Sequence, residues 1–470
     1  MSPKRKNLVK RSGIFFSFLF VCLVIGFLWS KDSGGPSLPF LQADGDTFRP
    51  YMARDIAVDP EGSVYVTGYG YGENSDYDFV TIKYDDQGNL IWAKRYNGPA
   101  NSSDYAQAMA LDRDGHVYVA GHSNGSAMSL DATLVKYDKD GKELWVARYD
   151  GSFHRDDWAY DLDCDGQGNI VVTGYSFGQG TEHDWLILKY GAGGDLLWKA
   201  IYNSPFNRDD MCQALAFDSK GNVILTGIDR TRETSYDMTT LKYDAEGNLK
   251  WAARYTGQEG AFDAGEAVGV DSSGIVYVTG YGYTGETDDD LVTASYDENG
   301  KERWIVRFDG PSNRIDRGLA LAVIPGSGVC VTGTSYGLET DADSLTIRYD
   351  SEGNQVWSAR HDGEGNGADV THSIALDPKS NVIVAGYSRG QDTGRDYLII
   401  KYDAQGRQIW VKRYDGLAHQ EDAATAMTVD MKGNVYVTGY SQGGETDFGF
   451  ATLKYNPGGR LDWEARYKEE

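Results

Sequence analysis

Cysteine and proline are scarce in this sequence, with 4 Cys and 11 Pro among 470 residues. Cys22 lies in an apolar N-terminal run, and Cys164, Cys212 and Cys330 occupy different positions of the repeat described below. No pair of them shares a register that indicates a disulfide, and no CxxC motif offers metal ligands. We therefore expect three core thiols and no disulfide framework.

The short motifs that identify common enzyme classes are also absent. The sequence contains no nucleophile elbow, phosphate-binding loop, HExxH pair or dinucleotide-binding fingerprint. The glycine-containing run at residues 68–73 follows an expected strand and precedes no helix, so we interpret it as a turn. No catalytic activity can be assigned from motifs.

Positive charge is in short supply. The chain has 45 Lys and Arg against 70 Asp and Glu, a net charge of −25. Five basic and no acidic residues fall within the first 30 positions, so the rest is five units more negative, at −30. Such a body repels phosphate backbones and anionic lipids, which excludes nucleic acid as an expected partner. High acidity favours solubility outside the cell, and a cationic partner is the alternative.

The N-terminus has the pattern of an export signal. Its basic residues precede an uncharged apolar run at residues 14–29, with no A-x-A cleavage motif after it. We expect a signal-anchor or a cleaved signal peptide over residues 1–30 and a tether over 31–52. In both cases the positive-inside rule places the remainder, residues 53–470, outside the cytoplasm, in the periplasm or at the cell surface.

What the sequence has in abundance is glycine, tyrosine and tryptophan, arranged in a repeat. Composition includes 58 Gly, 32 Tyr and 11 Trp, typical of short strands joined by turns. A tryptophan recurs every 53 residues, at Trp92, Trp145, Trp198, Trp251, Trp304, Trp357, Trp410 and Trp463. Tyrosine at position 84 and glycine at position 68 recur with the same period. Eight copies of one unit are therefore present, without insertion or deletion.

Each unit contains four expected strands. In the first copy these are residues 54–58, 63–69, 78–84 and 90–96, and the sequences DPEG and DDQG supply tight turns within the outer pairs. A repeated four-stranded antiparallel meander predicts an all-β, eight-bladed β-propeller. A solenoid is the competitor, but the terminal copies lack the atypical caps that solenoids need. We expect each blade to come from one repeat, with the strand at 54–58 innermost.

The consensus AxDxxGNVYVTGYS…D…TIKYDxxGNxxWxxRYxG resembles the SBBP-type bacterial β-propeller repeat, and its strand order is similar to that of NHL repeats. The resemblance covers residues 53 to 467 and implies the fold and secretion, but no uniform activity. The YDxxGNxxW portion also resembles the tryptophan-docking segment of eight-bladed quinoprotein dehydrogenases. The adjacent cysteine pair of those enzymes is missing here, which argues against quinone binding.

Residues found in every blade are best explained by packing. We expect the eight tryptophans to wedge between blades, and Trp251→Ala to cost roughly 3–5 kcal/mol. Asp59, Lys83 and Arg95, each recurring in seven blades, predict a cross-strand charge ladder. An aspartate precedes each blade after the first, at Asp104, Asp157, Asp210, Asp263, Asp316, Asp369 and Asp422. Turn bonding or pairing with arginine explains these aspartates and those like Asp78, and Ca²⁺ at each blade is the alternative; we expect no other cofactor.

Positions that differ between blades are the candidates for function. At the start of the innermost strand, on the side of the long loops, the copies read Arg54, Gln107, Tyr160, Gln213, Glu266, Leu319, His372 and Thr425. Arg54, Tyr160, Glu266 and His372 are our candidate ligand contacts around the channel mouth. A second candidate patch, at blades 2 and 3, comprises His122, His154, Trp158, Glu182, His183 and Trp185. The histidine spacing fits no zinc pattern, so we expect no metal there.

Two functions follow from these features. The first is a non-catalytic, monomeric binding or scaffold module for protein or glycan partners at the cell envelope, touching the membrane only through its N-terminal segment. The second is a carbohydrate-active enzyme, a lyase or hydrolase, with its site at the channel mouth on the long-loop face. That reading needs Glu266, His372 or a nearby aspartate as acid and base.

Overall fold

The computed structural model describes residues 50–72, 75–125, 129–232, 235–258, 261–283, 285, 288–364, 367–444 and 448–469. The expected N-terminal signal and nearly all of the expected tether lie outside these residues. Within the described part of the chain, no helix is long and apolar enough to cross a membrane.

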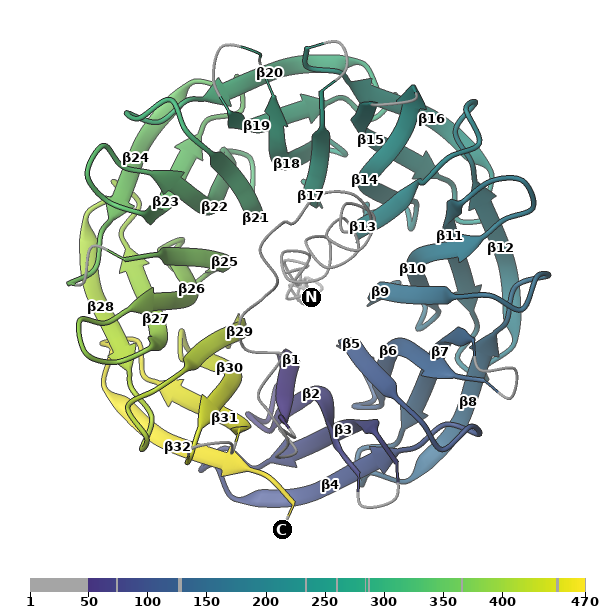
Figure 1. Ribbon diagram of the computed structural model, residues 1–470, viewed down its shortest axis with the longest axis horizontal. Coiled ribbons are helices and arrows are strands. Elements are labelled where there is room, and N and C mark those ends of the chain that lie inside the picture. Colours follow the sequence, from purple (N-terminus) through teal and green to yellow (C-terminus); the bar gives the residue numbers. More distant parts are fainter. Residues whose placement is uncertain are drawn as a thin grey trace, which may run out of the picture.

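The strands form a ring of eight antiparallel sheets around a central channel (Figure 1). Blades 1 and 2 contain β1 (Met52–Val58), β2 (Val64–Tyr71), β3 (Tyr77–Tyr84), β4 (Leu90–Tyr96), β5 (Asp104–Leu111), β6 (Val117–Asn124), β7 (Leu130–Tyr137) and β8 (Glu143–Tyr149). Blades 3 and 4 contain β9 (Asp157–Cys164), β10 (Ile170–Phe177), β11 (His183–Tyr190), β12 (Leu196–Tyr202), β13 (Met211–Phe217), β14 (Val223–Arg232), β15 (Ser235–Tyr243) and β16 (Leu249–Tyr255).

The second half of the ring repeats the pattern. Blades 5 and 6 contain β17 (Asp263–Val270), β18 (Val276–Tyr283), β19 (Asp289–Tyr296), β20 (Glu302–Phe308), β21 (Asp316–Ile324), β22 (Gly328–Tyr336), β23 (Ala342–Tyr349) and β24 (Gln355–His361). Blades 7 and 8 contain β25 (Asp369–Leu376), β26 (Val382–Arg389), β27 (Arg395–Tyr402), β28 (Gln408–Tyr414), β29 (Asp422–Val429), β30 (Val435–Gln442), β31 (Phe448–Tyr455) and β32 (Leu461–Tyr467). The predicted eight-bladed propeller, with one repeat per blade and its first strand innermost, is confirmed.

The tight turns within a blade are fixed by aspartate. In the turn between β3 and β4, Asp85 Oδ1 accepts hydrogen bonds from the backbone N–H groups of Gln87 at 3.0 Å and Asn89 at 2.8 Å. Gly88 in the same turn has a φ of +85°, a conformation that favours glycine. These turns share one face of the disc because alternate connections of an antiparallel meander lie at the same end of the sheet. The longer β2–β3 and inter-blade connections lie on the opposite face, here called the long-loop face.

The repeated tryptophans join each blade to the next. Trp92 Nε1 donates to the carbonyl oxygen of Lys139 at 3.2 Å, and its ring covers Gly141, where a Cβ atom would come within 2.8 Å of the indole. The same bond from Trp463 to the Asp86 carbonyl, at 3.0 Å, closes the ring between blades 8 and 1. The tryptophans therefore pack between blades as the sequence predicts.

The expected charge ladder divides into two separate pairings. Lysine on the third strand meets aspartate of the first turn, as in Lys189–Asp165 at 3.1 Å and Lys401–Asp377 at 2.9 Å, with all four side chains almost fully buried. The arginines of the outer strand do not join this pairing. They turn toward the long-loop face and bind other aspartates there, as described next.

Candidate functional site

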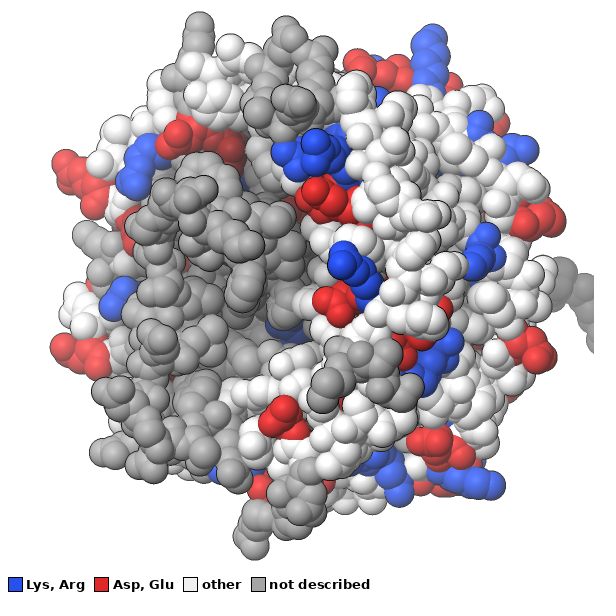
Figure 2. Space-filling view, turned by 45° about the vertical axis from the view of Figure 1, so that its right-hand side comes forward, with Lys and Arg blue, Asp and Glu red and all other residues white. Residues whose placement is uncertain are grey.

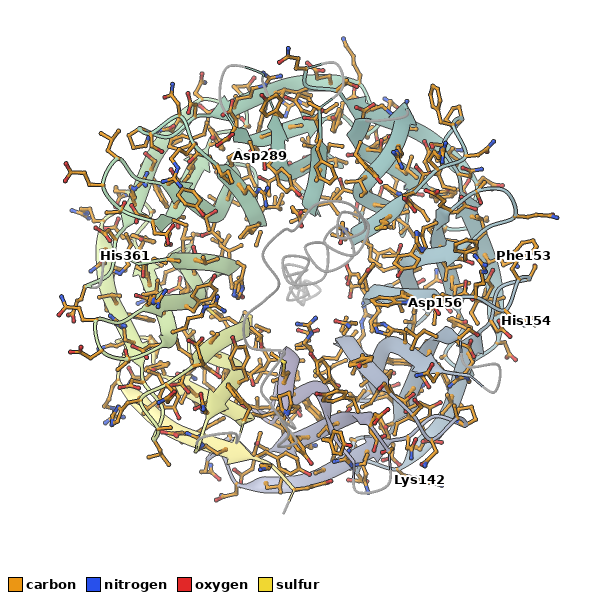
Figure 3. The ribbon with its side chains drawn as sticks, in the orientation of Figure 1. Lys142, Phe153, His154, Asp156, Asp289 and His361 are labelled. Carbon is orange, nitrogen blue, oxygen red and sulfur yellow. The ribbon has the colours of Figure 1, made fainter. Side chains whose placement is uncertain are left out.

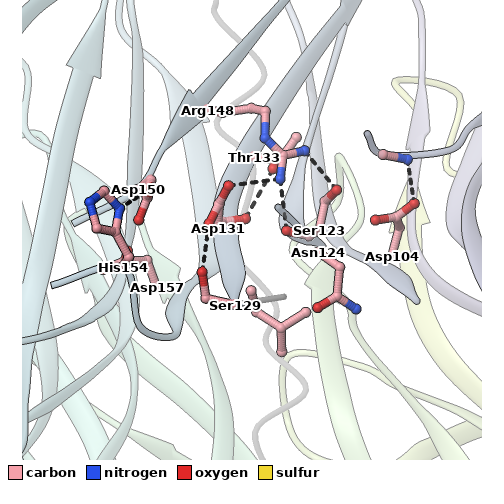
Figure 4. A network of polar contacts seen from close by, with 12 residues as sticks. Asp104, Ser123, Asn124, Ser129, Asp131, Thr133, Arg148, Asp150, His154 and Asp157 are labelled. Carbon is pink, nitrogen blue, oxygen red and sulfur yellow. Dashed lines mark hydrogen bonds and ion pairs between the residues drawn. The ribbon is translucent and has the colours of Figure 1, made fainter. Parts of the chain in front are cut away.

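A polar network recurs at the blade junctions on the long-loop face (Figure 4). Between blades 2 and 3, Arg148 lies 2.9 Å from Asp131 and donates to Ser123 Oγ at 2.7 Å. Asp157 accepts a hydrogen bond from the backbone N–H of Gly151 at 2.6 Å, and so fixes the inter-blade connection. The expected pairing of these aspartates with arginine and with local turns is thus present, and it gives the repeated acids a structural role.

The junction aspartates are held in an unusual electrostatic state. Burial raises the pKa of Asp104, Asp157, Asp263, Asp316 and Asp422 to about 6. The ordinary value for an aspartate is 3.8. Hydrogen bonds from backbone N–H groups oppose this effect and do not cancel it. The long-loop face therefore contains a series of carboxyl groups that titrate in the mildly acidic range.

Nine clusters of buried apolar residues are found among the described residues, and eight of them correspond to the eight blade junctions. The ninth has no counterpart in the symmetry. It spans blades 3 to 5 and contains Trp158, Tyr160, Tyr175, Met211, Ile228, Ala264 and Tyr281, with Leu130, Tyr236 and Phe262 packed against it. We call it the aromatic cluster. A unique site has to use residues that break the symmetry, so this cluster is the starting point for function.

The rings of the aromatic cluster form a continuous series of contacts with two histidines. The imidazole of His122 stacks on Trp158 with ring centroids 3.9 Å apart, and Trp158 stacks on Tyr175 at 5.5 Å. Tyr175 meets His183 edge-on at 4.5 Å. Burial, with the charge of Arg54 adding to it, lowers the pKa of His122 to about 3. His122 is therefore a neutral aromatic ring at physiological pH.

Charged side chains border this cluster at the junction of blades 3 and 4. His183 Nδ1 lies 2.6 Å from Asp209 Oδ1. Arg230 Nη1 lies 3.9 Å from a carboxylate oxygen of Asp209 and also 3.9 Å from one of Glu182. The Tyr236 hydroxyl donates to Asp209 Oδ2 at 3.4 Å. We call these five residues the acid–histidine group.

The pKa values of the two acids of this group are shifted in opposite directions. A hydrogen bond with Asp209, and then burial, raises the pKa of Glu182. Burial alone would also raise the pKa of Asp209, but hydrogen bonds from His183 and Glu182 lower it below its usual value. Asp209 is thus a carboxylate surrounded by hydrogen-bond donors. These donors are partly exposed at the outer edge of the acid–histidine group. Next to aromatic rings, such an arrangement suits a ligand with apolar faces and many hydroxyl groups.

The predicted channel-mouth residues prove to be the site of a β-bulge. In blade 1 the pairing of β1 with β2 shifts between Ala53 and Asp55, which leaves Arg54 as the extra residue. The same shift occurs in the other seven blades. All eight bulged side chains except Gln107 are buried. Their diversity therefore reflects contacts between neighbouring blades as well as differences at the mouth.

The candidate contacts at the bulges are spread around the ring. Arg54 donates to Gln107 Oε1 of the next blade at 3.2 and 3.0 Å. Burial lowers the pKa of His372 to about 3, and the charge of Arg54 acts in the same direction. Glu266 is also buried, and it belongs to blade 5 whereas His372 belongs to blade 7. The structure does not place the two on neighbouring blades as an acid and base would require.

The predicted patch at blades 2 and 3 is only partly one site. Trp158, which lies in β9 and not in the preceding loop, contacts Tyr160 at 6.0 Å and reaches His183 through Tyr175. His154 is separate, since it lies at the rim of the disc with its Nδ1 2.6 Å from Asp150 (Figure 3).

Trp185 is the clearest departure from the predicted patch. It is fully buried, and its Nε1 donates to the carbonyl oxygen of Ile228 at 2.8 Å. Trp185 therefore packs blade 3 against blade 4 and has no surface to offer a ligand. His183 and Trp185 lie two residues apart on β11 and so face the same side of the sheet, toward blade 4. Trp185 lies further from the long-loop end of the strand, within the interface of the two blades.

Sequence reasoning missed Asp209, Arg230 and Tyr236. Each occupies a repeat position that varies between blades, so the symmetry argument could have found them. Position 209, for example, is serine in blade 2 and phenylalanine in blade 5. The three residues come from different parts of blades 3 and 4, and only the fold brings them to His183.

Four groups of acidic and histidine side chains among the described residues could hold a metal ion. One, formed by Asp112, Asp114 and His116, lies at a tight turn, where Asp112 already accepts two backbone hydrogen bonds. The other three lie at the junctions between blades 5 and 8. Over the visible described surface, acidic and basic side chains alternate without a large area of one sign (Figure 2).

Two protein-family models match parts of the chain. A model described as outer membrane protein assembly factor BamB matches residues 237–469, just under half of the chain. A model described as beta-propeller repeat, SBBP, matches residues 91–126. The second match agrees with the resemblance found in the repeat consensus.

Two curated relatives are distant and much longer. Uncharacterized WD repeat-containing protein L264 of Acanthamoeba polyphaga mimivirus is 22% identical over 443 residues, covering 77% of this chain and 30% of that protein. Regulatory protein FlaEY of Caulobacter vibrioides is 29% identical over 148 residues, covering 28% of this chain and 15% of that protein. The chain thus spans less than a third of the length of either relative.

Similar solved structures include an ulvan lyase, a polysaccharide lyase, with a TM-score of 0.42 and 13% identity over 76% of this chain and 90% of the other. The β-propeller domain of the trilobed protease from Pyrococcus furiosus has a TM-score of 0.42 and 12% identity over 78% of this chain and 98% of the other. The repeat consensus, the SBBP match and the eight four-stranded blades together assign this chain to the β-propeller repeat proteins.

Proposed function

We propose that this protein is an extracytoplasmic β-propeller that binds glycans at the cell envelope through the aromatic cluster and the acid–histidine group beside it. The observation that carries the proposal is the ninth apolar cluster, which has no symmetry counterpart among the described residues. Eight clusters suffice to pack eight blades against one another. A further cluster that gathers aromatic rings beside charged groups on the long-loop face therefore supports a role in binding.

The chemistry of the site favours a sugar over other ligands. Phe262 lies 5.0 Å from the Tyr236 ring and stacks on Tyr281 at 5.9 Å. Phe262 and Tyr236 are the partly exposed rings at the edge of the otherwise buried aromatic cluster, and they are the rings that a sugar can reach. Aromatic faces pack against the C–H faces of sugar rings, while carboxylate and guanidinium groups bind their hydroxyls. Asp209 and Arg230 supply both kinds of polar group within the same site.

The location in the envelope rests on the N-terminal sequence and on charge. A basic start followed by an apolar run at residues 14–29 supports export of the propeller. The strongly acidic propeller is suited to remain soluble there. A monomer that is anchored by the N-terminal segment, or released after its cleavage, would present the long-loop face to glycans of the envelope.

Binding to envelope polysaccharides and to a glycan array tests the proposal. We expect His183→Ala to weaken binding at least about tenfold, because it removes a hydrogen bond to the buried charge of Asp209, worth roughly 1.5–3 kcal/mol. Arg395→Ala is the matched control, since Arg395 occupies the same repeat position in blade 7, opposite blade 3, and should leave affinity unchanged.

An equal loss of affinity in both variants would count against the site. So would a failure of the wild type to bind either the envelope polysaccharides or the glycan array. Binding of a peptide library with the same dependence on His183 would redirect the proposal to a protein partner. Circular dichroism of both variants controls for folding.

A second candidate function is a carbohydrate-active enzyme. It is favoured by the raised pKa of Glu182, caused by Asp209, in a group that also contains an imidazole and a phenol. Catalysis at a glycosidic bond uses one carboxyl group with a raised pKa as the acid and a second carboxyl group that stays ionised. Polysaccharide turnover that is lost in Glu182→Gln and Tyr236→Phe would support an enzyme. Absence of turnover by the wild type on substrates that it binds would leave the binding function alone.

A further inference from the structure

Three carboxylates converge at each of three blade junctions, on the side of the ring away from blades 1 to 4. Their spacing is the same each time, 19 and then 7 residues. The three groups, here called the acid triads, are Asp290–Asp309–Asp316, Asp343–Asp362–Asp369 and Asp396–Asp415–Asp422. The first residue lies in the third strand of a blade, the second follows the fourth strand, and the third begins the next blade.

The spacing of the oxygen atoms matches a calcium site. Within each triad, one oxygen from every carboxylate lies within 4.8 Å of the other two. Two ligands of the same Ca²⁺ can be no further apart than twice the bond length of about 2.3–2.6 Å. Carboxylate and hydroxyl oxygens are the ligands that this hard cation prefers. One ion can therefore contact all three carboxylates without a large rearrangement.

Buried carboxylate oxygens of the triads lack a partner, which acidity alone does not explain. Asp343 Oδ1 and Asp396 Oδ1 are buried without a hydrogen bond, although the other oxygen of each carboxylate is paired with arginine. At Asp369, Oδ2 accepts the Gly363 N–H at 2.5 Å, and the fully buried Ser388 hydroxyl bonds the same carboxyl group. A Cβ atom built on Gly363 would lie 2.5 Å from Ser388 Oγ and 2.7 Å from Asp369 Oδ1, so these atoms are neighbours. Ser441 repeats this arrangement beside Asp422.

The acids at these junctions outnumber the cations that pair with them. At the junction of blades 6 and 7, Arg360 lies 2.6 Å from Asp343 and compensates one carboxylate. Asp362 and the fully buried Asp369 have only the His361 imidazole beside them to offset their charge, and only when it is protonated. Burying a carboxylate without a counter-charge is costly, and a divalent cation supplies the missing charge.

The junction of blades 2 and 3 shows that the same spacing is not sufficient. Asp131, Asp150 and Asp157 have the spacing of a triad, and Asp150 pairs with His154 (Figure 4), but these three carboxylates are not among the groups whose oxygen atoms converge. At the other junctions of the first half, asparagine or threonine replaces the middle aspartate, as at Asn97. The junction of blades 7 and 8 keeps its triad although His419 binds Asp415.

We propose that the acid triads at the junctions of blades 5–6, 6–7 and 7–8 bind Ca²⁺ and fasten these blades to one another. The proposal is independent of the glycan site, which lies on blades 3 to 5. Calcium enters through the middle residues, Asp309 and Asp362, which are exposed to solvent. Each ion joins strands of two adjacent blades.

Thermal unfolding of the full chain in EDTA and in 5 mM CaCl₂ tests the proposal. We expect Ca²⁺ to raise Tm by about 5 °C, because a ligand that binds only the folded state stabilises it. Titration calorimetry should show about three ions per chain, with dissociation constants of roughly 0.1–1 mM. In the triple variant Asp309→Asn, Asp362→Asn, Asp415→Asn, both the Tm rise and the heat of binding should disappear.

A control variant removes the same number of charges elsewhere. Asp140→Asn, Glu246→Gln and Glu352→Gln lie at exposed tight turns outside the triads, and this variant should keep the full response to Ca²⁺. No rise of Tm in the wild type, or an equal loss of response in both variants, would overturn the proposal. If the triple variant is unstable in EDTA as well, single Asp309→Asn and Asp362→Asn variants should each lose about one ion by calorimetry, and unchanged stoichiometry would refute the sites.

Discussion

Blades 2 to 5 and blades 5 to 8 are built from the same repeat, yet their long-loop faces differ in chemistry. The first arc carries the aromatic cluster and the acid–histidine group. The second arc carries the three acid triads and no comparable cluster among its described residues. The inter-blade cores beneath are alike, with buried β-branched and tyrosine side chains in both arcs.

This difference separates two kinds of position in the repeat. Side chains that face the next blade are constrained by close packing, so the same residue types recur there. Positions at the ends of strands on the long-loop face meet other loops and solvent. These positions hold aromatic residues in the first arc and aspartates in the second.

The largest effect that we predict concerns the inter-blade cores, where the exposure of each tryptophan, and not the arc to which it belongs, should set the loss of stability. Trp410→Ala should destabilise the ring by roughly 3–5 kcal/mol, because Trp410 is 8% exposed. Trp251→Ala should cost less, about 2–3 kcal/mol, because Trp251 is partly exposed although its Nε1 donates to the Glu298 carbonyl at 3.1 Å. Denaturant unfolding of both variants measures the two values.

A larger loss for Trp251 than for Trp410 would mean that the arcs also differ in their cores. The sequence-based value of roughly 3–5 kcal/mol for Trp251→Ala assumed full burial. The structure lowers the expectation for Trp251 and for the five other repeat tryptophans that are partly exposed, namely Trp145, Trp198, Trp304, Trp357 and Trp463.

A smaller effect concerns pH and the first arc. Burial raises the pKa of Asp210, between blades 3 and 4, to about 7. The folded state then binds a proton that the unfolded chain has released, so this residue contributes stability below about pH 4 that is lost as pH rises to about 7. We expect Tm, measured in EDTA, to fall between pH 5 and pH 8.

Asp210→Asn should reduce this fall of Tm without abolishing it, because an amide does not titrate whereas the junction aspartates with a pKa of about 6 still do. Asp244→Asn is a control at an exposed tight turn, where hydrogen bonds from Asn248 lower the pKa of the aspartate. That variant should leave the slope between pH 5 and pH 8 unchanged. An unchanged slope of Tm against pH in Asp210→Asn would show that other buried acids dominate the pH dependence.

The smallest predicted effect is at His154. It lies at the rim with Asp150, and hydrogen bonding to that carboxylate raises its pKa. His154→Ala should leave glycan affinity unchanged within about twofold and change stability by less than about 0.5 kcal/mol. A marked loss of affinity, by the same assay used for His183→Ala, would extend the site to the rim.

The 53-residue repeat and the residues of the tight turns were enough to predict the architecture, since eight tryptophans at one spacing permit few alternative folds. The site was predicted in part, because His122, Trp158 and His183 broke the repeat visibly. Trp185 also broke it, but this residue lies further than His183 from the long-loop end of β11 and packs in the core between blades 3 and 4. The bulge at Arg54 could not be read from the sequence, because it depends on how β1 pairs with β2.

Closure of the ring has a consequence for the order of the repeats along the chain. Blade 8 is made wholly of the last repeat, and the seam is sealed by Trp463 with the Asp86 carbonyl and by Arg95 with Glu469. No strand of the described part of the chain crosses the seam, so each repeat forms a complete blade and the starting point of the ring is arbitrary. A circular permutant that joins residue 469 to residue 50 through a linker and begins within the loop before Asp263 would keep every strand pairing.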